Sequence, residues 1–380
     1  MLHFTPEEFA RRTALFEEER ERRGLDAVLL FAQESHYWLT GFDTFGFCFF
    51  QCLVAGKHAP TLLARSADLR QAQLTSTIED VRIWKDAADA NPAEDLADIL
   101  KARGLAGKRV GIELDTHGLT AANYRKVEAA LADLVTLVDA CDLISTLRLT
   151  KSAEEIPYIR RAAELADDAL DAALPRIKPG TDESAILAAM QGAVFSGGGD
   201  YPGNPFIIGA GDHALLCRYQ SGRRTLQAQD QITLEWAGVY RQYHAAMMAT
   251  PTIQPTDQHR HLHAACKAAL EACEATLKPG NTMGDVFAAH AKTLDDLGLS
   301  ESRLNACGYS LGTSFAPSWM EHQMFYEGAP TIIAPGMVFF LHMILMDSDT
   351  GTAMTLGRTS LVEETSSTPL SRHGLDLIAL

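Results

Sequence analysis

Two segments that start at residues 177 and 277 repeat one pattern, and this repeat constrains the fold more than any other feature. Residues 177–194 read IKPGTDESAILAAMQGAV, and residues 277–294 read LKPGNTMGDVFAAHAKTL. Each copy follows a helical stretch, carries a Pro-Gly turn before a second helical stretch, and precedes a series of strands. The second part of the chain is therefore predicted to contain two divergent copies of one unit: helix, Pro-Gly turn, helix and strands.

A different alternation fills the beginning of the chain. Predicted helices cover residues 6–23, 93–103 and 121–132, and predicted strands cover residues 27–31, 61–64 and 110–114. Strands separated by helices predict a small α/β sheet covered by helices. At residues 146–159, TLRLTKSAEEIPYI, Ser152 can cap a new helix whose first turn carries Glu154 and Glu155. We therefore expect an α/β domain over 1–148 and an α+β domain over 149–380.

Charge and composition exclude several classes of partner. The 33 basic and 49 acidic side chains give a formal charge of −16, which repels nucleic acid and anionic membranes. The chain has no apolar run long enough to cross a membrane and no apolar signal core at its start, so we expect a cytoplasmic protein. The seven cysteines lack paired C-x-x-C spacing, which indicates neither a disulfide framework nor a structural zinc site. Most of them are expected to be small buried apolar residues.

Several motifs together resemble the creatinase and prolidase family, an M24-like group. They are RLTKSAEEI (148–156), the two Pro-Gly segments, QITLEWAGVYRQYHAAMMAT (231–250), GYSLG (308–312) and IAPGMVFFLHMI (333–344). The resemblance spans nearly the whole chain. It implies an N-terminal creatinase-like α/β domain and a pseudo-duplicated α+β domain of the "pita-bread" type. It also implies a homodimer in which each N-terminal domain lies over the partner's site.

Metal-dependent members of that family bind two cations through five side chains, and the present chain differs at these positions. The two hairpin aspartates correspond to Glu235 and Ala246, the histidine to Tyr309, and the first glutamate to His342. The last glutamate falls within residues 357–359, GRT, which contain no carboxylate. Hard divalent ions need clustered oxygen and imidazole ligands. We therefore expect no metal and no other cofactor, and Xaa-Pro peptidase activity is disfavoured.

Further motifs resemble the metal-free ectoine hydrolase branch of the family. They are YWLTGFDTFGFCFFQCL (37–53), GGDYP (198–202), LEWAGVYRQYH (234–244) and GTSFAPSWMEH (312–322). A creatinase-type catalytic glutamate would fall at Met248, so creatine hydrolysis is disfavoured. Creatinase and ectoine hydrolase, the two metal-free branches, both carry a histidine at the position of Cys217. In this chain the histidine His213 lies four residues earlier. This departure leaves the substrate open.

Two residues are the catalytic candidates. Glu235 lies in an otherwise apolar strand, where burial raises the proton affinity of a carboxylate as a general acid/base requires. The alternative is a structural remnant of the lost metal site. His244 could carry a proton to a leaving nitrogen near neutral pH, and the alternative is a core histidine with satisfied hydrogen bonds.

A second set of residues is expected to bind the substrate. Trp319 and Glu321, in a loop after Pro317, would together hold a delocalised cation, unless this is a solvated loop. The remaining candidates are Tyr201, Phe45, Tyr309, His342 and Cys217. The alternative for the aromatic residues and for His342 is a structural role in the hydrophobic core. Covalent catalysis by Cys217 with His213 as its base would need a helix between them, whereas strand and loop are expected there.

These residues predict metal-independent hydrolysis of a C–N bond in a small zwitterionic, amidine-like compound. The alternatives are a hydrolase or lyase of another small nitrogen compound and a non-catalytic ligand-binding protein.

Overall fold

The computed structural model describes residues 1–218 and 222–380, and this part of the chain forms two compact units. The first unit is Met1–Arg148 and the second is Leu149–Leu380. Within the described residues, no helix is both long and apolar enough to cross a membrane.

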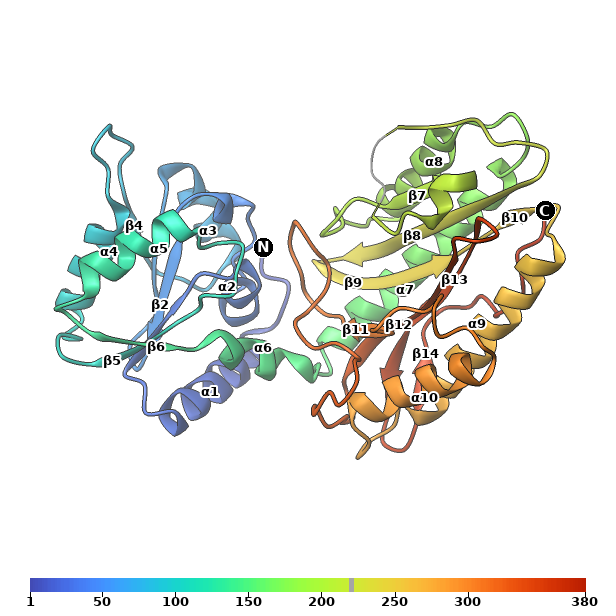
Figure 1. Ribbon diagram of the computed structural model, residues 1–380. Helices are drawn as coiled ribbons and strands as arrows, with labels where there is room; N and C mark the ends of the chain where they lie inside the picture. Colours follow the sequence, from blue (N-terminus) through green and yellow to red (C-terminus); the bar gives the residue numbers. More distant parts are fainter. Residues whose placement is uncertain (219–221) are drawn as a thin grey trace. The chain divides into compact units, whose positions relative to one another are not determined.

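The first unit is built on a mixed six-stranded sheet in the order β4-β3-β2-β1-β5-β6. Its strands are β1 (Ala27–Leu30), β2 (Cys52–Gly56), β3 (Thr61–Ala64), β4 (Asp80–Ile83), β5 (Arg109–Ile112) and β6 (Thr136–Asp139). Its helices are α1 (Pro6–Arg22), α2 (Gln33–Thr40), α3 (Leu69–Thr75), α4 (Pro92–Ala102), α5 (Ala121–Leu131) and α6 (Cys141–Leu149). Separate apolar clusters form on the two sides of this sheet, so it is covered by helices as predicted (Figure 1).

The sequence pattern did not reveal helices α2, α3 and α6. Seven of the eight residues of α2 are buried, from Gln33 to Thr40 with Glu34 as the exception, so no apolar stripe of helical period marks it. Two of the buried polar side chains of this helix bond to nearby backbone. The His36 ring bonds to the Leu30 carbonyl at 2.8 Å, and the Gln33 amide donates to the Phe42 carbonyl at 2.6 Å.

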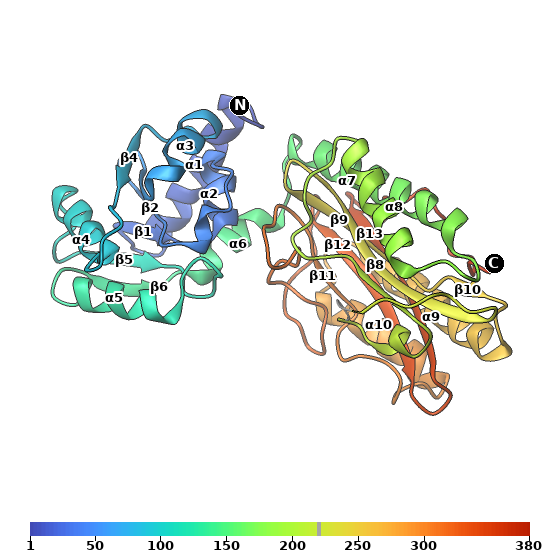
Figure 2. The same cartoon turned by 90° about the horizontal axis from the view of Figure 1, so that it is seen from above.

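The second unit is built on an eight-stranded sheet. Six strands follow the order β10-β8-β9-β13-β12-β11 (Figure 2). In addition, β7 pairs with β8, and β14 pairs with β13. The strands are β7 (Ile207–Ala210), β8 (Asp230–Tyr240), β9 (Tyr243–Ala249), β10 (Thr252–Ile253), β11 (Gly308–Ser310), β12 (Val338–Asp347), β13 (Thr352–Val362) and β14 (Ser367–Pro369). The long helices are α7 (Glu155–Ala173), α8 (Glu183–Ser196), α9 (Asp257–Thr276) and α10 (Met283–Asp296). The first of them begins at Glu155, with Glu154 rather than the predicted Ser152 at its N-cap position. Ser152 still bonds to the start of this helix: its Oγ accepts from the Glu155 N–H at 3.3 Å, and the Glu155 carboxylate accepts from the Ser152 N–H at 2.8 Å.

The two Pro-Gly turns have matching geometry, which confirms the predicted repeat. Gly180 and Gly280 both adopt positive φ, 86° and 91°, a conformation that favours glycine. The N–H of Gly180 donates to Leu226 and the N–H of Gly280 to Ile333, so each turn is tied to an extended segment that follows its second helix. Each half thus packs a helix pair, α7 with α8 and α9 with α10, against its own strands.

The two faces of the second sheet have different surroundings. On β8, the Trp236 indole donates to the Ala166 carbonyl of α7 at 2.8 Å, so this face is covered by helix. Glu235, next to Trp236, must point to the opposite face because side chains alternate along a strand. The face of the sheet opposite to α7 is therefore the one that carries Glu235.

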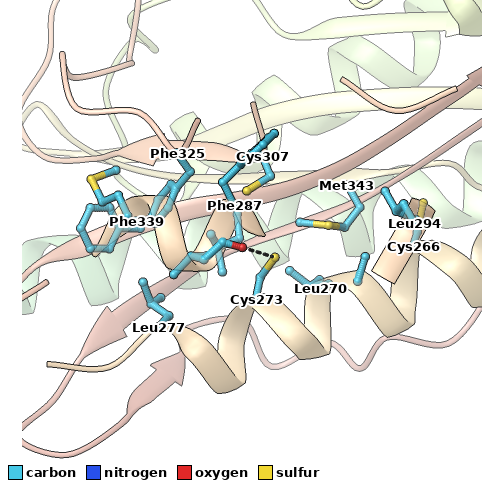
Figure 3. Close-up of a cluster of buried hydrophobic side chains, with 14 of the residues drawn as sticks. Cys266, Leu270, Cys273, Leu277, Phe287, Leu294, Cys307, Phe325, Phe339 and Met343 are labelled. Atoms are coloured by element: carbon cyan, nitrogen blue, oxygen red, sulfur yellow. Dashed lines mark hydrogen bonds between the residues drawn. The ribbon is translucent and has the colours of Figure 1, made fainter. Parts of the chain in front are cut away.

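Cysteines 266, 273 and 307 lie in the apolar core between β12 and the helices α9 and α10 (Figure 3). Cys273 and Cys307 are fully buried, and the Cys273 thiol faces the Val286 carbonyl at 3.7 Å. All seven cysteines are free. The expectation of buried apolar roles holds for these three and for Cys52, whereas Cys48 is exposed and Cys141 is half-buried.

Candidate functional site

The register of the second sheet brings distant candidates onto one face. Glu235 pairs with Met248, Met248 with Gly357, and Gly357 with His342. Directly paired residues project to the same side of a sheet. One row across four strands therefore begins with the Glu235 carboxylate and ends with the His342 imidazole.

A neighbouring row completes the site. Ala237 pairs with Ala246, the Thr359 hydroxyl donates to the Ala246 carbonyl at 2.8 Å, and Thr359 pairs with Phe340, which pairs with Tyr309. The Tyr309 ring lies 5.7 Å from the His342 ring, between centroids. All the positions at which metal-dependent relatives would carry ligands thus share this face, although the residues there differ.

A directed hydrogen-bond chain connects Trp319, Tyr309 and Glu235. The Trp319 indole N–H donates to the Tyr309 hydroxyl at 2.8 Å. An indole can only donate, so the Tyr309 hydroxyl is left to donate its own hydrogen to Glu235 Oε1, 3.4 Å away. Trp319 is 1% exposed and Tyr309 is 3% exposed, so the donor groups of both hydrogen bonds lie in the core.

The environment of Glu235 favours its protonated form. Burial raises the pKa of Glu235 from 4.5 to about 7, while the positive charge of Arg218 and the hydrogen bond from Tyr309 act in the opposite direction. The side chain is partly rather than fully enclosed. A carboxylate with such a pKa can both accept and return a proton near neutral pH.

A second histidine, His290, lies near His342, and the sequence analysis did not identify it. Burial lowers the pKa of His342 to about 4, and nearby His290, on α10, lowers it further. His290 is 1% exposed, and burial lowers its pKa to about 4 as well. Within the described part of the chain, neither Nδ1 atom has a hydrogen-bond partner. The repeat carried a signal for His290, because the equivalent position in the first copy is Met190, a buried apolar residue.

The prediction of His244 as a proton shuttle was wrong. His244 is fully buried, its Nε2 accepts from the Gly203 N–H at 2.9 Å, and its Nδ1 lies 2.9 Å from the Gln242 carbonyl. Because a carbonyl can only accept, Nδ1 carries the hydrogen and the ring is neutral. Burial lowers the pKa of His244 to about 4. Both ring nitrogens therefore hold the backbone in place, and neither is available for proton transfer.

Glu321 also differs from its prediction, because its carboxylate already has a cation. The Lys151 ammonium donates to Glu321 Oε2 at 2.9 Å, and Ser310 Oγ donates to the same oxygen. The side chains of Lys151 and Glu321 are only 1% and 5% exposed. The pair joins the first residues of the unit to the loop that carries Trp319, so Glu321 acts as a structural anchor rather than as the receptor for a substrate cation.

The aromatic residues predicted to bind the substrate lie in different environments. Trp319 lies in the core, which excludes the alternative that this residue belongs to a solvated loop. It is linked to the site through its hydrogen bond to Tyr309. Tyr201 is 81% exposed and packs edge-on against Phe195, with ring centroids 5.1 Å apart, so it does not line an enclosed cavity. Phe45 belongs to the first unit and is 78% exposed, and its role at a partner's site stays a prediction.

Cys217 lies near Glu235 but lacks the features of a nucleophile. Burial raises the pKa of its thiol, and the negative charge of Glu235 raises it further. His213 belongs to a short 3₁₀ helix, Gly211–Leu215, that ends before Cys217, so no α-helix places the two side chains on one face. The geometry does not support Cys217 as a covalent catalyst.

Comparison with known proteins agrees with this architecture. Residues 157–364 match the model of metallopeptidase family M24, and residues 12–150 match that of the creatinase/prolidase N-terminal domain. The chain belongs to the M24 family. The recombinant prolidase from Thermococcus sibiricus has the same fold, with a TM-score of 0.88 and 19% identity over 98% of this chain and 99% of that one.

Curated relatives span nearly the full chain. An uncharacterised hydrolase/peptidase of Sinorhizobium fredii is 26% identical over 100% of this chain and 99% of its own. The ectoine hydrolase of Halomonas elongata is 28% identical over 93% of each chain. A Xaa-Pro dipeptidase of Lactobacillus delbrueckii subsp. lactis is 23% identical over 84% of this chain and 85% of its own. The family is thus hydrolytic, and its members differ in substrate.

The residues present do not fit the metal site that the family's name, metallopeptidase, implies. Of the corresponding side chains, Glu235 supplies the one carboxylate and His342 the one imidazole, beside Tyr309 and Ala246. Across the residues with described positions, no group of three His, Cys, Asp or Glu side chains could hold a metal ion together. A pair of hard cations needs several oxygen ligands at one place, which this donor set does not offer.

Proposed function

We propose that this protein hydrolyses a C–N bond in a small zwitterionic, amidine-like compound without a metal, with Glu235 as its general base and acid. The observation that carries the proposal is the Glu235 carboxylate itself. It lies on the face of the sheet opposite to α7, its pKa is raised to about 7 by burial, and it accepts one hydrogen bond from Tyr309.

One carboxylate is sufficient for both proton transfers. Glu235 takes a proton from water while the water oxygen forms a bond to the substrate carbon. The new hydroxyl oxygen then forms the C=O bond as the C–N bond breaks. The leaving nitrogen takes the proton from Glu235, and the hydroxyl hydrogen is released to solvent water. His244 has no part in these steps. Tyr309 stabilises the ionised form of Glu235 and fixes the position of its Oε1 atom.

The charges around the site suit a zwitterion. With the donor set unable to hold two cations, the substrate carbon must itself be electrophilic, as the carbon of a protonated amidine is. Such a cation would lie between the Glu235 carboxylate and the aromatic and imidazole rings of Tyr309 and His342. Arg218 is exposed, and its positive charge acts on Glu235, so we expect this charge to attract the carboxylate of a substrate. The named activity of the Halomonas elongata relative supports the same class of substrate.

A panel of substrates tests this function. Chelator-treated protein would be incubated with ectoine, hydroxyectoine, creatine and Xaa-Pro dipeptides, and all products followed by mass spectrometry. We expect water to be added to ectoine or to a similar zwitterion, unaffected by chelator or by added Mn²⁺. Metal-dependent cleavage of the dipeptides would contradict the proposal. A zwitterion that raises the melting temperature but is recovered unchanged would indicate a binding protein instead.

We also propose that the protein forms a homodimer in which Phe45 completes the partner's site. Sedimentation analysis would test the dimer. Phe45→Ala should raise KM more than it lowers kcat. A monomer with full activity would contradict this arrangement.

A further inference from the structure

The turn between β8 and β9 has a strained backbone that its surroundings hold in place. Arg241 and Gln242 form this two-residue turn, and both have positive φ, 50° and 68°, a conformation that favours glycine or asparagine. The Arg241 N–H donates to the Asp200 carboxylate at 2.5 Å. The Gln242 carbonyl accepts from the Ser314 N–H at 3.1 Å. The turn is therefore fixed by two loops that are distant from each other in sequence.

These two loops are residues 198–205, which follow α8, and residues 311–320, which follow β11. Both are bonded to His244 of β9. Its Nε2 accepts from the Gly203 N–H at 2.9 Å, and its backbone N–H donates to the Gly312 carbonyl at 3.1 Å. His244 thus holds the first loop by its ring and the second by its backbone. The first loop contains the motif GGDYP (198–202), to which the candidate site gave no role.

The two loops also meet directly at Trp319. Its backbone N–H donates to Asn204 Oδ1 at 3.2 Å, and its carbonyl accepts from Ser314 Oγ at 3.1 Å. A Cβ atom on Gly203 would lie only 2.7 Å from the Ser318 carbonyl carbon and 2.8 Å from the Trp319 nitrogen. A side chain at position 203 therefore fits only if the backbone of Trp319 moves.

The position of Trp319 affects Glu235 through the directed hydrogen-bond chain. The indole N–H donates to the Tyr309 hydroxyl at 2.8 Å, and this hydroxyl donates to Glu235, 3.4 Å away. A hydroxyl that accepts a hydrogen bond is polarised and donates its own hydrogen more strongly. The bond to Glu235 is longer than most O–H···O bonds, so a small displacement of Trp319 is enough to weaken it.

We propose that Gly203 and Asn204 are positioning residues, which hold Trp319 where its indole orients the Tyr309 hydroxyl toward Glu235. This inference rests on the role of Glu235 in the proposed function. It gives the loop of residues 198–205 a task in that function: the loop supports the donor chain from outside the site and contacts no reacting atom.

A double-mutant cycle on the titration of Glu235 tests this role in the full chain. The pKa of Glu235 would be measured by ¹³C NMR of the glutamate carboxyls. Gly203→Ala and Asn204→Ala should each raise it by roughly 0.3–1 unit, because the bond from Tyr309 becomes weaker. In the Tyr309→Phe background neither change should have a further effect, because Trp319 then has no hydroxyl to orient.

A matched control exists for the glycine. At Gly192, in α8, an added Cβ atom would meet nothing within 4 Å, so Gly192→Ala should leave the titration of Glu235 unchanged. Asn204→Ala removes one half-buried side chain and adds no atoms, so it tests the proposal even if Gly203→Ala does not fold.

The cycle separates this proposal from other causes of a shift. Within the described chain, Glu235 interacts electrostatically with Arg218, Cys217 and Tyr309, none of which belongs to the two loops. An unchanged titration in Asn204→Ala, or a shift that persists in the Tyr309→Phe background, would contradict the positioning role. Because the cycle needs no substrate, a negative substrate panel would overturn the proposed hydrolysis and leave this result intact.

Discussion

Two carboxylates of the second unit, the half-buried Glu235 and the buried Glu321, have opposite environments. Glu321 accepts bonds from the Lys151 ammonium and from Ser310, and its side chain is 5% exposed. Glu235 accepts one long hydrogen bond, 3.4 Å, from the Tyr309 hydroxyl, and burial raises its pKa to about 7.

The difference shows how burial can serve structure in one place and chemistry in another. A buried ion pair is stable only while both partners are present, and it holds its loop in place. Burial of a carboxylate that has no direct cationic partner destabilises the ionised form and raises the pKa. A raised pKa is the property that proton transfer near neutral pH needs. The candidate mechanism therefore requires Glu321 to fix the position of Trp319 and Tyr309, and requires that no cation of the protein forms a direct ion pair with Glu235.

The largest expected effect follows from the removal of the Glu235 carboxylate. Glu235→Gln should lower turnover of the substrate found in the panel by a factor of about 10²–10⁴, since general acid–base catalysis contributes that much. The melting temperature should stay the same or rise, because an amide costs less to bury than a carboxylate. The exposed Glu327→Gln is the control. Equal turnover in Glu235→Gln would remove this residue from the mechanism.

The next effect concerns the ion pair. Lys151→Met should lower the free energy of unfolding by about 3–5 kcal/mol, because it leaves the buried Glu321 without its cation. The double variant Lys151→Met, Glu321→Met should recover most of this loss. Denaturant titration measures both. A loss below about 1 kcal/mol in the single variant would mean that the pair does not anchor this loop.

A third effect is the pH dependence of stability. The folded-state pKa of Glu235 lies above its unfolded value, at about 7 against 4.5, so between these pH values the folded state binds more protons. Its contribution is thus fully present at the low end of this range and is lost as pH rises, by an amount on the order of 2–3 kcal/mol. Subtracting the profile of Glu235→Gln cancels the contributions of His342 and the other buried histidines. A flat difference between pH 4.5 and 7 would show that Glu235 titrates normally.

The smallest effect concerns Tyr309. Tyr309→Phe removes the hydrogen bond that lowers the pKa of Glu235, so the acidic limb of the pH–rate profile should move to higher pH, by roughly one unit. The protein should remain folded, because the ring keeps its contacts with Phe340 and His342. An unchanged profile would show that the long hydrogen bond has no influence on Glu235.

The repeat and its motifs predicted much of this architecture. The Pro-Gly turns, the long helices and the hairpin of β8 and β9 are encoded by local signals such as caps, turn residues and apolar runs. Glu235 could also be identified, since a carboxylate inside an apolar strand is rare enough to be informative. Helix α2 escaped notice because burial on nearly every side erases the amphipathic pattern.

The errors at the site arose from long-range pairing. Nothing close to Glu321 in sequence indicates Lys151, which precedes it by 170 residues, and the Gly203 N–H that engages His244 is 41 residues away. Sequence patterns identify ionisable groups but not their hydrogen-bond and ion-pair partners. Those partners decide whether a side chain is free to react.

The titration of Glu235 tests the central claim most directly. Protein labelled with ¹³C at the side-chain carboxyls of glutamate would be followed by NMR between pH 4 and 9. Burial also raises the pKa of Glu113, in the first unit, to about 7, so Glu235→Gln and Glu113→Gln are both needed for assignment. We predict a carboxyl resonance that titrates near pH 7 and is lost only in Glu235→Gln. If Glu235 instead titrates near pH 4.5, it is an ordinary carboxylate, and the proposed role as both base and acid is contradicted.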